Sequence, residues 1–185
     1  VRSKDINDVP LCFAVADGLG GHDAGEVASR VVLEQLLAEI KKNGNSFLLE
    51  PELLKGVIEA IHTDISALGI NKVKKEMGST LVGALFNREK FIVFNAGDSR
   101  LYMFRDGYLA QKTRDHSLAE QVGGNVPRNY IISCIGGGFK DIMIDIYDLT
   151  GKVKVNDLVI LCSDGLTDIN MDKNYNDLEN IIKNN

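Results

Sequence analysis

Three aspartates in this sequence stand beside a glycine at the end of a predicted strand. Asp17 follows the apolar run 11–16, Asp164 follows the run 158–162, and Asp98 lies in a further connection between strands. An aspartate in such a turn can present its carboxylate together with an unhindered backbone carbonyl, and hard divalent cations prefer these oxygen ligands. Taken alone, each turn is more often only a turn than a metal ligand. As a set on rigid strand ends, the three carboxylates predict a site for one or more divalent ions.

Two helices are predicted between the first strand and the remaining ones. Apolar residues recur at helical spacing over 26–42, with Asp23 opening a capping box and Gly44 just past the expected end. A second apolar stripe begins after Pro51, which suits the first turn of a helix, and it stops at Gly69. We expect both helices to cover an apolar surface.

The rest of the chain is rich in predicted strands. Alternating or continuous apolar runs occupy residues 79–86, 91–95, 101–104, 108–112, 142–149 and 158–162. Short polar connections, one of them an Asp-Gly turn at 106–107, predict an antiparallel meander. A last helix is expected over about 175–182. Because the strands are grouped apart from the helices, the predicted fold class is α+β and not alternating βαβ.

Length and composition predict one globular domain over residues 1–185. Hydrophobic residues make up 44% and charged residues 25%, close to the average of soluble domains. The net charge of -5 offers no basic surface for nucleic acid or an anionic membrane. The 3 cysteines form no Cys-x-x-Cys pair, so we expect neither a disulfide framework nor a zinc site, but a reducing, cytoplasmic setting. No apolar stretch approaches the ~18 residues that span a bilayer.

The segment FAVADGLGGH at residues 13–22, followed by GEVAS at 25–29, resembles the signature of a known enzyme family. This is the PPM family of metal-dependent protein serine/threonine phosphatases, the type 2C class, and the resemblance is strongest to its bacterial-type members. Further blocks that resemble the family follow in its order at residues 78–81, 95–100, 113–117, 135–137 and 162–166. Such an ordered set over most of the chain is far more specific than any single motif.

The resemblance implies a four-layer sandwich, in which two packed antiparallel β-sheets are flanked by α-helices and a metal centre lies at one end. Asp17 would bridge two ions, the carbonyl oxygen of Gly18 would bind one of them, and Asp164 would bind the other. Asp98 matches a position that helps to hold a further ion. The expected cofactors are therefore two or more ions of Mn²⁺ or Mg²⁺, both of which accept octahedral oxygen sites.

The same resemblance implies hydrolysis of phosphoserine and phosphothreonine by direct attack of a metal-activated water, with Asp17 in the catalytic centre. His22 is either the general acid that protonates the leaving alkoxide or a residue that orders the glycine turn. Arg2 matches the family's phosphate-binding arginine, since a guanidinium group suits a phosphoryl group. His116 is expected to order a loop, and His62 is expected to have a structural role.

Three parts of the family pattern are short or missing. Only Asp5 and Asp8 are available for an acidic motif before the first strand, the flap between Ser117 and Cys134 is compressed, and no Asp-Asn block follows Asn170. We therefore expect the sequence to omit segments of the catalytic domain.

Other classes of function stay open at this point. A catalytically inactive member of the family could act as a phosphoprotein-binding or regulatory module; the missing carboxylates favour it, whereas the intact Asp17 and Asp164 turns favour the enzyme. A small-molecule phosphohydrolase or a calcium-stabilised domain is a third hypothesis. For the enzyme, the expected partners are phosphoproteins that a serine/threonine kinase modifies, with no nucleic acid, and the expected state is a monomer.

Overall fold

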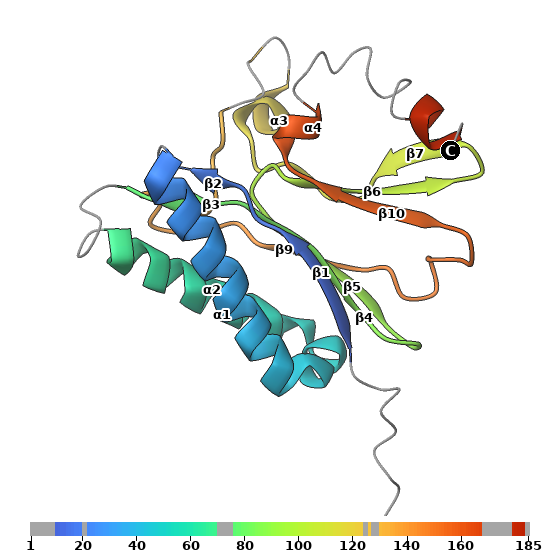
Figure 1. The fold of residues 1–185 in the computed structure, drawn as a ribbon, viewed down its shortest axis with the longest axis horizontal. Coiled ribbons are helices and arrows are strands. Elements are labelled where there is room, and N and C mark those ends of the chain that lie inside the picture. The colour runs from blue at the N-terminus through green and yellow to red at the C-terminus, as the bar shows by residue number, and fades with distance from the viewer. Residues whose placement is uncertain are drawn as a thin grey trace, which may run out of the picture.

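Antiparallel sheets and two long helices make up the computed structural model of this chain (Figure 1), which describes residues 10–19, 22–69, 76–123, 126, 130–167 and 179–183. The helices are α1 (His22–Leu49), α2 (Pro51–Leu68), α3 (Leu118–Val122) and α4 (Asp164–Thr167). The strands are β1 (Leu11–Val15), β2 (Gly18–Leu19), β3 (Gly78–Ser79), β4 (Leu81–Phe86), β5 (Phe91–Ala96), β6 (Arg100–Arg105), β7 (Tyr108–Gln111), β8 (Ile135–Gly136), β9 (Asp145–Asp148) and β10 (Leu158–Cys162).

The described strands form three sheets, and each strand pair in them is antiparallel. The first sheet has the strand order β1-β4-β5-β9, the second has the order β10-β6-β7, and a third, small sheet has the order β2-β3-β8. The two long helices follow each other in the chain and do not alternate with parallel strands, so the predicted α+β class with antiparallel sheets is confirmed.

The predicted meander is wrong at one point, because its two hairpins belong to different sheets. β4 pairs with β5 in the first sheet, and β6 pairs with β7 in the second. The chain crosses between the sheets in the turn 97–99, where Gly97 has a φ of 120°. Residues with a side chain rarely adopt this φ, so glycine permits the sharp crossing. The apolar alternation could not reveal the crossing, since the same period suits either sheet.

The first sheet divides the apolar core into two clusters. On one face, Leu85 and Ile92 pack with buried residues of α1 and α2. On the other face, Val82 and Val93 pack with Leu101 of the second sheet. Neighbouring residues of β4 and β5 thus alternate between the clusters, as the pleat of a strand requires. The two long helices therefore lie against one face of the first sheet, and the second sheet lies against the other (Figure 1).

The first long helix, α1, extends further than predicted. It includes Asp23, which we expected before the helix, and it runs past Gly44, which we expected after it. The extension is stabilised because Phe47 and Leu48 are buried in the core. Gly44 does not end the helix. It allows Pro10 to pack closely against α1, since a Cβ atom on Gly44 would lie 2.6 Å from Cγ of Pro10.

The second helix begins and ends as predicted. Pro51 is its first residue, and the backbone N–H of Gly69 caps its end by donating to the carbonyl oxygens of Ile65 and Ser66. Of the predicted last helix, residues 179–183 are helical, and the earlier part lies outside the described residues. Within the described ranges, none of the helices combines the length and the hydrophobicity that crossing a membrane requires.

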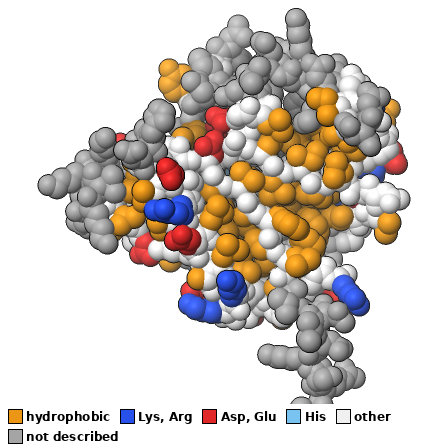
Figure 2. All heavy atoms as spheres, viewed as in Figure 1, with side chains coloured by type: hydrophobic (Ala, Val, Ile, Leu, Met, Phe, Trp, Pro, Cys, Tyr) orange, Lys and Arg blue, Asp and Glu red, His pale blue; other side chains and the backbone are white. Residues whose placement is uncertain are grey.

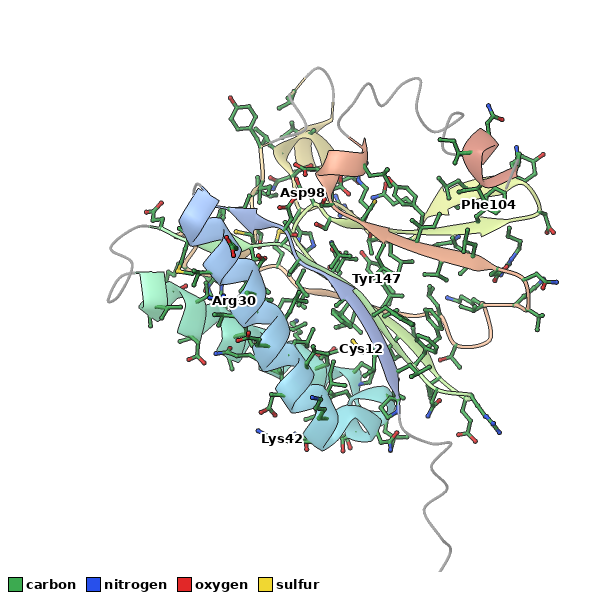
Figure 3. All side chains as sticks on the ribbon, in the orientation of Figure 1. Cys12, Arg30, Lys42, Asp98, Phe104 and Tyr147 are labelled. Carbon is green, nitrogen blue, oxygen red and sulfur yellow. The ribbon has the colours of Figure 1, made fainter. Side chains whose placement is uncertain are left out.

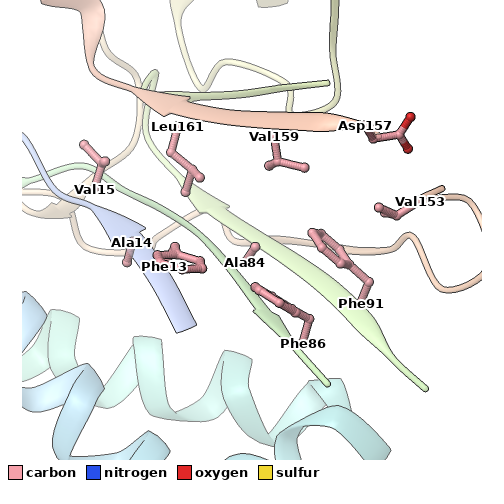
Figure 4. Close-up of a pocket in the computed structure, with 10 residues that line it drawn as sticks. All are labelled: Phe13, Ala14, Val15, Ala84, Phe86, Phe91, Val153, Asp157, Val159 and Leu161. Carbon is pink, nitrogen blue, oxygen red and sulfur yellow. The ribbon is translucent and has the colours of Figure 1, made fainter. Parts of the chain in front are cut away.

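An apolar groove of about 520 Å³ opens between β1 of the first sheet and β10 of the second (Figure 4). The rings of Phe13 and Phe86 stack along it with centroids 5.9 Å apart, and Phe91 continues the stack at 5.1 Å. Hydrophobic side chains gather on this face of the molecule (Figure 2), and Leu11 and Phe13 are each 58% exposed. β1 and β10 are end strands of their sheets. Among the described residues, the two sheets are therefore open to solvent along this side.

Candidate functional site

Asp17 lies in the short connection between β1 and β2, where the chain leaves the first sheet for the small one. Thr80 holds this connection from the facing strands: the backbone N–H of Asp17 donates to Oγ1 of Thr80 over 3.0 Å, and the backbone N–H of Thr80 donates to the carbonyl oxygen of Asp17 over 2.8 Å. The hydroxyl of Ser79 donates to the same carbonyl oxygen over 3.1 Å. The backbone of Asp17 is therefore fixed, and this restricts where its carboxylate can lie.

The next residue, Gly18, meets the first turn of α1 backbone to backbone. A Cβ atom on Gly18 would lie 2.0 Å from the carbonyl oxygen of Gly25, and one on Gly25 would lie 2.7 Å from the carbonyl oxygen of Gly18. No side chain fits at such distances, so both positions require glycine for close packing. The close contact between Gly18 and Gly25 thus brings the start of α1 directly against the segment that carries Asp17.

Asp164 opens α4 directly after β10, and its carboxyl group shares a hydrogen bond with that of Asp17. Burial raises the pKa of Asp17, and the hydrogen bond and negative charge of Asp164 raise it further. A hydrogen bond from the backbone N–H of Gly18 acts in the opposite direction. Two ionised carboxyl groups in such contact repel each other, and a bound cation relieves that repulsion.

Asp98, in the turn that crosses between the sheets, experiences some of the same charges. Asp98 is only 7% exposed to solvent. Burial raises the pKa of its carboxyl group to about 6, the negative charges of Asp164 and Asp115 add to the shift, and Arg100 opposes it. Figure 3 places Asp98 near the start of α4, where Asp164 lies. The structure therefore brings the three predicted aspartates into one neighbourhood.

Arg100 neutralises this neighbourhood only in part, because its guanidinium group is bound to Asp115. Nε of Arg100 donates to both carboxylate oxygens of Asp115, over 2.9 and 3.0 Å, and a terminal nitrogen donates to one of them as well. The amide of Gln111 donates to the same carboxylate over 2.8 Å. The two charged side chains are 8% and 10% exposed. A buried ion pair is tolerated when hydrogen bonds satisfy both partners in this way.

The donor set suits a divalent cation. Carboxyl groups that crowd together raise one another's pKa, and a cation that prefers oxygen ligands removes that penalty by binding them in the ionised form. Asp17 and Asp164 supply a contacting pair, and Asp98 lies within their electrostatic reach. Within the described ranges, no group of three acidic, histidine or cysteine side chains is already converged on one point.

Some of the predicted site residues cannot be compared with the structure. Arg2, Asp5, Asp8 and the side chain of His22 lie outside the described residues, as does most of the segment in which a final Asp-Asn block was sought. In the predicted flap, α3 is capped by Ser117, whose side chain accepts a hydrogen bond from the backbone of residue 120. Residues 124–125 and 127–129 of the flap lie outside the described ranges.

His62 has the structural role that we predicted. Its Nδ1 accepts a hydrogen bond of 3.0 Å from the backbone N–H of Gly136, which has a φ of 71°.

Cys134 lies near Asp98: burial raises the pKa of its thiol to about 12, and the negative charge of Asp98 contributes. A thiol with such a pKa stays protonated and does not act as a nucleophile.

Sequence analysis missed the residues that hold the aspartates in place. It gave Thr80 and Arg100 no partners, because those partners, Asp17 and Asp115, are 63 and 15 residues away along the chain. The only available signal was that each of them lies in a block resembling the family, and such a block does not say which side chains meet. Hydrogen bonds over such separations follow from the sheet topology and not from local patterns.

The raised pKa of Asp98 predicts an unusual pH dependence of the stability of the metal-free protein. Its folded-state pKa of about 6 lies above the ~3.9 of an unfolded aspartate, so folding takes up a proton between these values. The stability linked to this group is full below about pH 4 and is lost as the pH rises to about 6, the reverse of a salt-bridged aspartate. At pH 7, Asp98→Asn should therefore be the more stable protein by on the order of 2 kcal/mol.

Circular dichroism melting curves of wild type and Asp98→Asn in chelator, from about pH 4 to about pH 7, test this expectation. The advantage of the variant should shrink steadily as the pH falls. An advantage that stayed constant, or that grew toward low pH, would contradict the raised pKa of Asp98.

Comparisons with known proteins cover nearly the whole chain. A family model described as Protein phosphatase 2C matches residues 2–184. The serine/threonine phosphatase stp of Listeria monocytogenes is 31% identical over 183 residues, which span 91% of this chain and 70% of that protein. The serine/threonine protein phosphatase PstP of Mycobacterium tuberculosis is 30% identical over 169 residues, which span 84% of this chain and 32% of that protein.

Solved structures of related phosphatases are similar to this chain in fold as well as in sequence. The serine/threonine phosphatase of S. agalactiae superimposes with a TM-score of 0.82 at 27% identity, over 95% of this chain and 76% of that one. The catalytic domain of PstP, solved in complex with 2 manganese ions, has a TM-score of 0.69 at 29% identity, over 91% of this chain and 76% of that one. The described sheets and helices are thus arranged as in these two phosphatases.

Proposed function

The chain belongs to the protein phosphatase 2C family, the PPM family of bacterial serine/threonine phosphatases, and on this premise we propose that it is a metal-dependent enzyme that hydrolyses phosphoserine and phosphothreonine in proteins. The observation that carries the proposal is the contact between the carboxyl groups of Asp17 and Asp164, with Asp98 nearby. These groups come from three separate turns, and a fold without a use for them would gain stability by replacing them.

In the proposed site, Asp17 and Asp164 would hold divalent ions, the carbonyl oxygen of Gly18 would provide a further ligand, and Asp98 would help to hold an additional ion. Mn²⁺ or Mg²⁺, when bound there, would supply a water of lowered pKa and positive charge beside the phosphoryl oxygens. The relative PstP, solved with 2 manganese ions, supports this choice of cofactor. Among these residues Asp17 has an anchored backbone, because its N–H donates a hydrogen bond to Thr80, and its carboxyl group contacts that of Asp164.

The chain's own side chains account for substrate binding and proton transfer in the proposal. Arg2 would bind the phosphoryl group, since its guanidinium group can donate two parallel hydrogen bonds. His22 would protonate the leaving alkoxide, a task that suits an imidazole titrating near neutral pH. The proposal requires no covalent phosphoenzyme. The hydroxyl groups of Ser79 and Thr80 instead take part in hydrogen bonds around Asp17, and the thiol of Cys134 is protonated.

The remaining expectations belong to the same proposal. Residues 1–185 would make up one catalytic domain that lacks some segments of its relatives, and its complete form would be the four-layer sandwich, with helices outside both main sheets. The enzyme would work as a monomer in the cytoplasm on phosphoproteins that a serine/threonine kinase produces. The stp phosphatase of Listeria monocytogenes, at 31% identity, supports this class of substrate.

The test is hydrolysis of p-nitrophenyl phosphate and of a phosphothreonine peptide with Mn²⁺, with chelator, and after Asp164→Asn. We expect turnover with Mn²⁺ that both chelator and Asp164→Asn reduce by about a hundredfold or more, because the ions supply several kcal/mol of transition-state stabilisation. Asp141→Asn, an exchange at an exposed aspartate, is the matched control and should retain activity. Folded protein that shows no turnover with Mn²⁺ or Mg²⁺ would contradict the enzyme and favour the phosphoprotein-binding module.

A further inference from the structure

The turn that carries Asp98 is held from behind by His116. The backbone N–H of Gly97 donates to Nδ1 of His116 over 3.0 Å, and the backbone N–H of His116 donates to the carbonyl oxygen of Gly97, also over 3.0 Å. His116 is only 1% exposed. A Cβ atom on Gly97 would lie 2.8 Å from the side chain of Thr80, so the turn is pressed between Thr80 and the imidazole. The residue directly before Asp98 is therefore fixed on both sides.

Asp145 of β9 in turn sets the orientation of the His116 ring. Because Nδ1 of the ring accepts a hydrogen bond, the neutral imidazole carries its proton on Nε2, and Nε2 lies 3.3 Å from Oδ2 of Asp145. The hydroxyl of Tyr147 donates to the same oxygen over 2.7 Å and accepts a hydrogen bond of 3.0 Å from the backbone N–H of Arg114. The carboxylate thus has fixed partners of its own, and it selects one tautomer and one ring position.

The residue directly after Asp98 connects the turn to Asp17. A hydrogen bond of 2.6 Å joins the hydroxyl groups of Ser99 and Thr80, and Oγ1 of Thr80 also accepts from the backbone N–H of Asp17. Asp98 lies between two anchored neighbours, Gly97 on the imidazole and Ser99 on the threonine that holds Asp17. A shift of the imidazole would therefore move the Asp98 carboxylate relative to Asp17.

We propose that His116, oriented by Asp145, is a positioning residue that sets the distance between the Asp98 and Asp17 carboxylates and thereby the affinity of the site for Mn²⁺. The inference rests on the proposed phosphatase function, because it takes these carboxylates as metal ligands. The competing explanation is that His116 only stabilises the fold, as His62 does.

His62 is the matched control that separates these explanations. It is also a buried histidine, 7% exposed, whose Nδ1 accepts a hydrogen bond of 3.0 Å from the backbone N–H of a glycine with positive φ, Gly136. Its glycine, however, is not next to any of the three aspartates in the sequence. His116→Ala and His62→Ala remove the same kind of hydrogen bond in the same protein, so a difference between them in metal affinity reports positioning and not general stability.

The experiment measures Mn²⁺ binding to the 185-residue chain by isothermal titration calorimetry, alongside thermal stability and the Mn²⁺ concentration that half-activates p-nitrophenyl phosphate hydrolysis. We expect His116→Ala to weaken Mn²⁺ binding by about tenfold or more, as the loss of a residue that orients a metal ligand does. His116→Asn can offer an acceptor to Gly97 at the same place and should restore binding to within about threefold of wild type. His62→Ala should lower the melting temperature and leave Mn²⁺ binding unchanged.

If His116→Ala does not fold, Asp145→Ala keeps the test decisive. The side chain of Asp145 is 36% exposed, so the protein should tolerate its loss. It should weaken Mn²⁺ binding, because the ring then loses its fixed orientation. If the folded His116 and Asp145 variants bind Mn²⁺ as tightly as His62→Ala does, the proposal is wrong. If wild type binds Mn²⁺ but hydrolyses no phosphoester, the phosphatase function fails while the binding comparison still decides the role of His116. Wild type that binds no Mn²⁺ would overturn both.

Discussion

Substituting Asp17 with asparagine is expected to lower kcat/KM with Mn²⁺ by about a thousandfold or more and, at the same time, to make the metal-free protein more stable. The activity falls because ions at such a centre supply several kcal/mol of transition-state stabilisation, and each 1.36 kcal/mol is about tenfold in rate. Asparagine has nearly the same shape but carries no charge, so it cannot hold the ions in the same way.

The gain in stability has its origin in the carboxyl pair. Burial, and then the hydrogen bond and charge of Asp164, raise the pKa of Asp17, so its ionised form is unfavourable in the folded protein without metal. At neutral pH the amide removes that penalty, and after allowance for solvent screening we expect on the order of 1 kcal/mol and a rise of a few degrees in melting temperature. Stability and function are therefore opposed at this residue.

Melting curves with chelator and with saturating Mn²⁺, together with steady-state kinetics, check both halves of the expectation. Wild type should gain stability from Mn²⁺, and Asp17→Asn should gain little. Asp64→Asn, on the exposed side of α2, serves as the control and should behave as wild type. A variant that melts lower than wild type in chelator, or that keeps the full stabilisation by Mn²⁺, would argue against Asp17 as a metal ligand.

Gly25→Ala is expected to destabilise the protein by about 3 kcal/mol and to abolish activity. A Cβ atom on Gly25 would lie 2.7 Å from the carbonyl oxygen of Gly18, and backbone atoms cannot move aside as a flexible side chain can. Helix propensity alone gives the opposite sign, since alanine is favoured over glycine within a helix by up to about 1 kcal/mol. The displaced first turn of α1 would also move Gly18, a proposed metal ligand.

Gly56→Ala provides the matched control, because Gly56 lies in α2 and a Cβ atom there would meet nothing within 4 Å. This variant should be more stable than wild type by about 0.5 to 1 kcal/mol. Urea unfolding of both variants measures the two free energies. If the two changes had the same sign and size, the close contact between Gly18 and Gly25 would not exist in the folded protein.

Local patterns were enough to predict most helices and strands, but not their assembly. β10 has the predicted bounds, and α2 begins at Pro51, the proline that we expected in its first turn. The assignment of β5 and β6 to different sheets was missed, because alternation gives the face of a strand and not its neighbour. Gly44 misled the prediction of α1, since burial of Phe47 outweighs the low helix propensity of one glycine.

For the candidate site, the residues could be predicted from the sequence but their contacts could not. Asp17, Asp98 and Asp164 could be selected from the sequence, because an aspartate beside glycine at a strand end is a local signal. Their contacts could not, since they depend on segments far apart in the chain: the carboxyl groups of Asp17 and Asp164 meet only when β1 and β10 are in place. His116 was expected to order a loop, but nothing in the sequence indicated that the loop carries Asp98.

The turn at residues 97–99 gives the proposed metal site a second consequence. This turn joins the first sheet to the second, while Asp17 follows the first sheet and Asp164 follows the second. An ion bound by these carboxylates would therefore act as a reversible cross-link between the two layers, comparable to a disulfide but broken by dilution of the metal. The concentration of free divalent cation would then govern how long the folded molecule survives proteases, in addition to how fast it works.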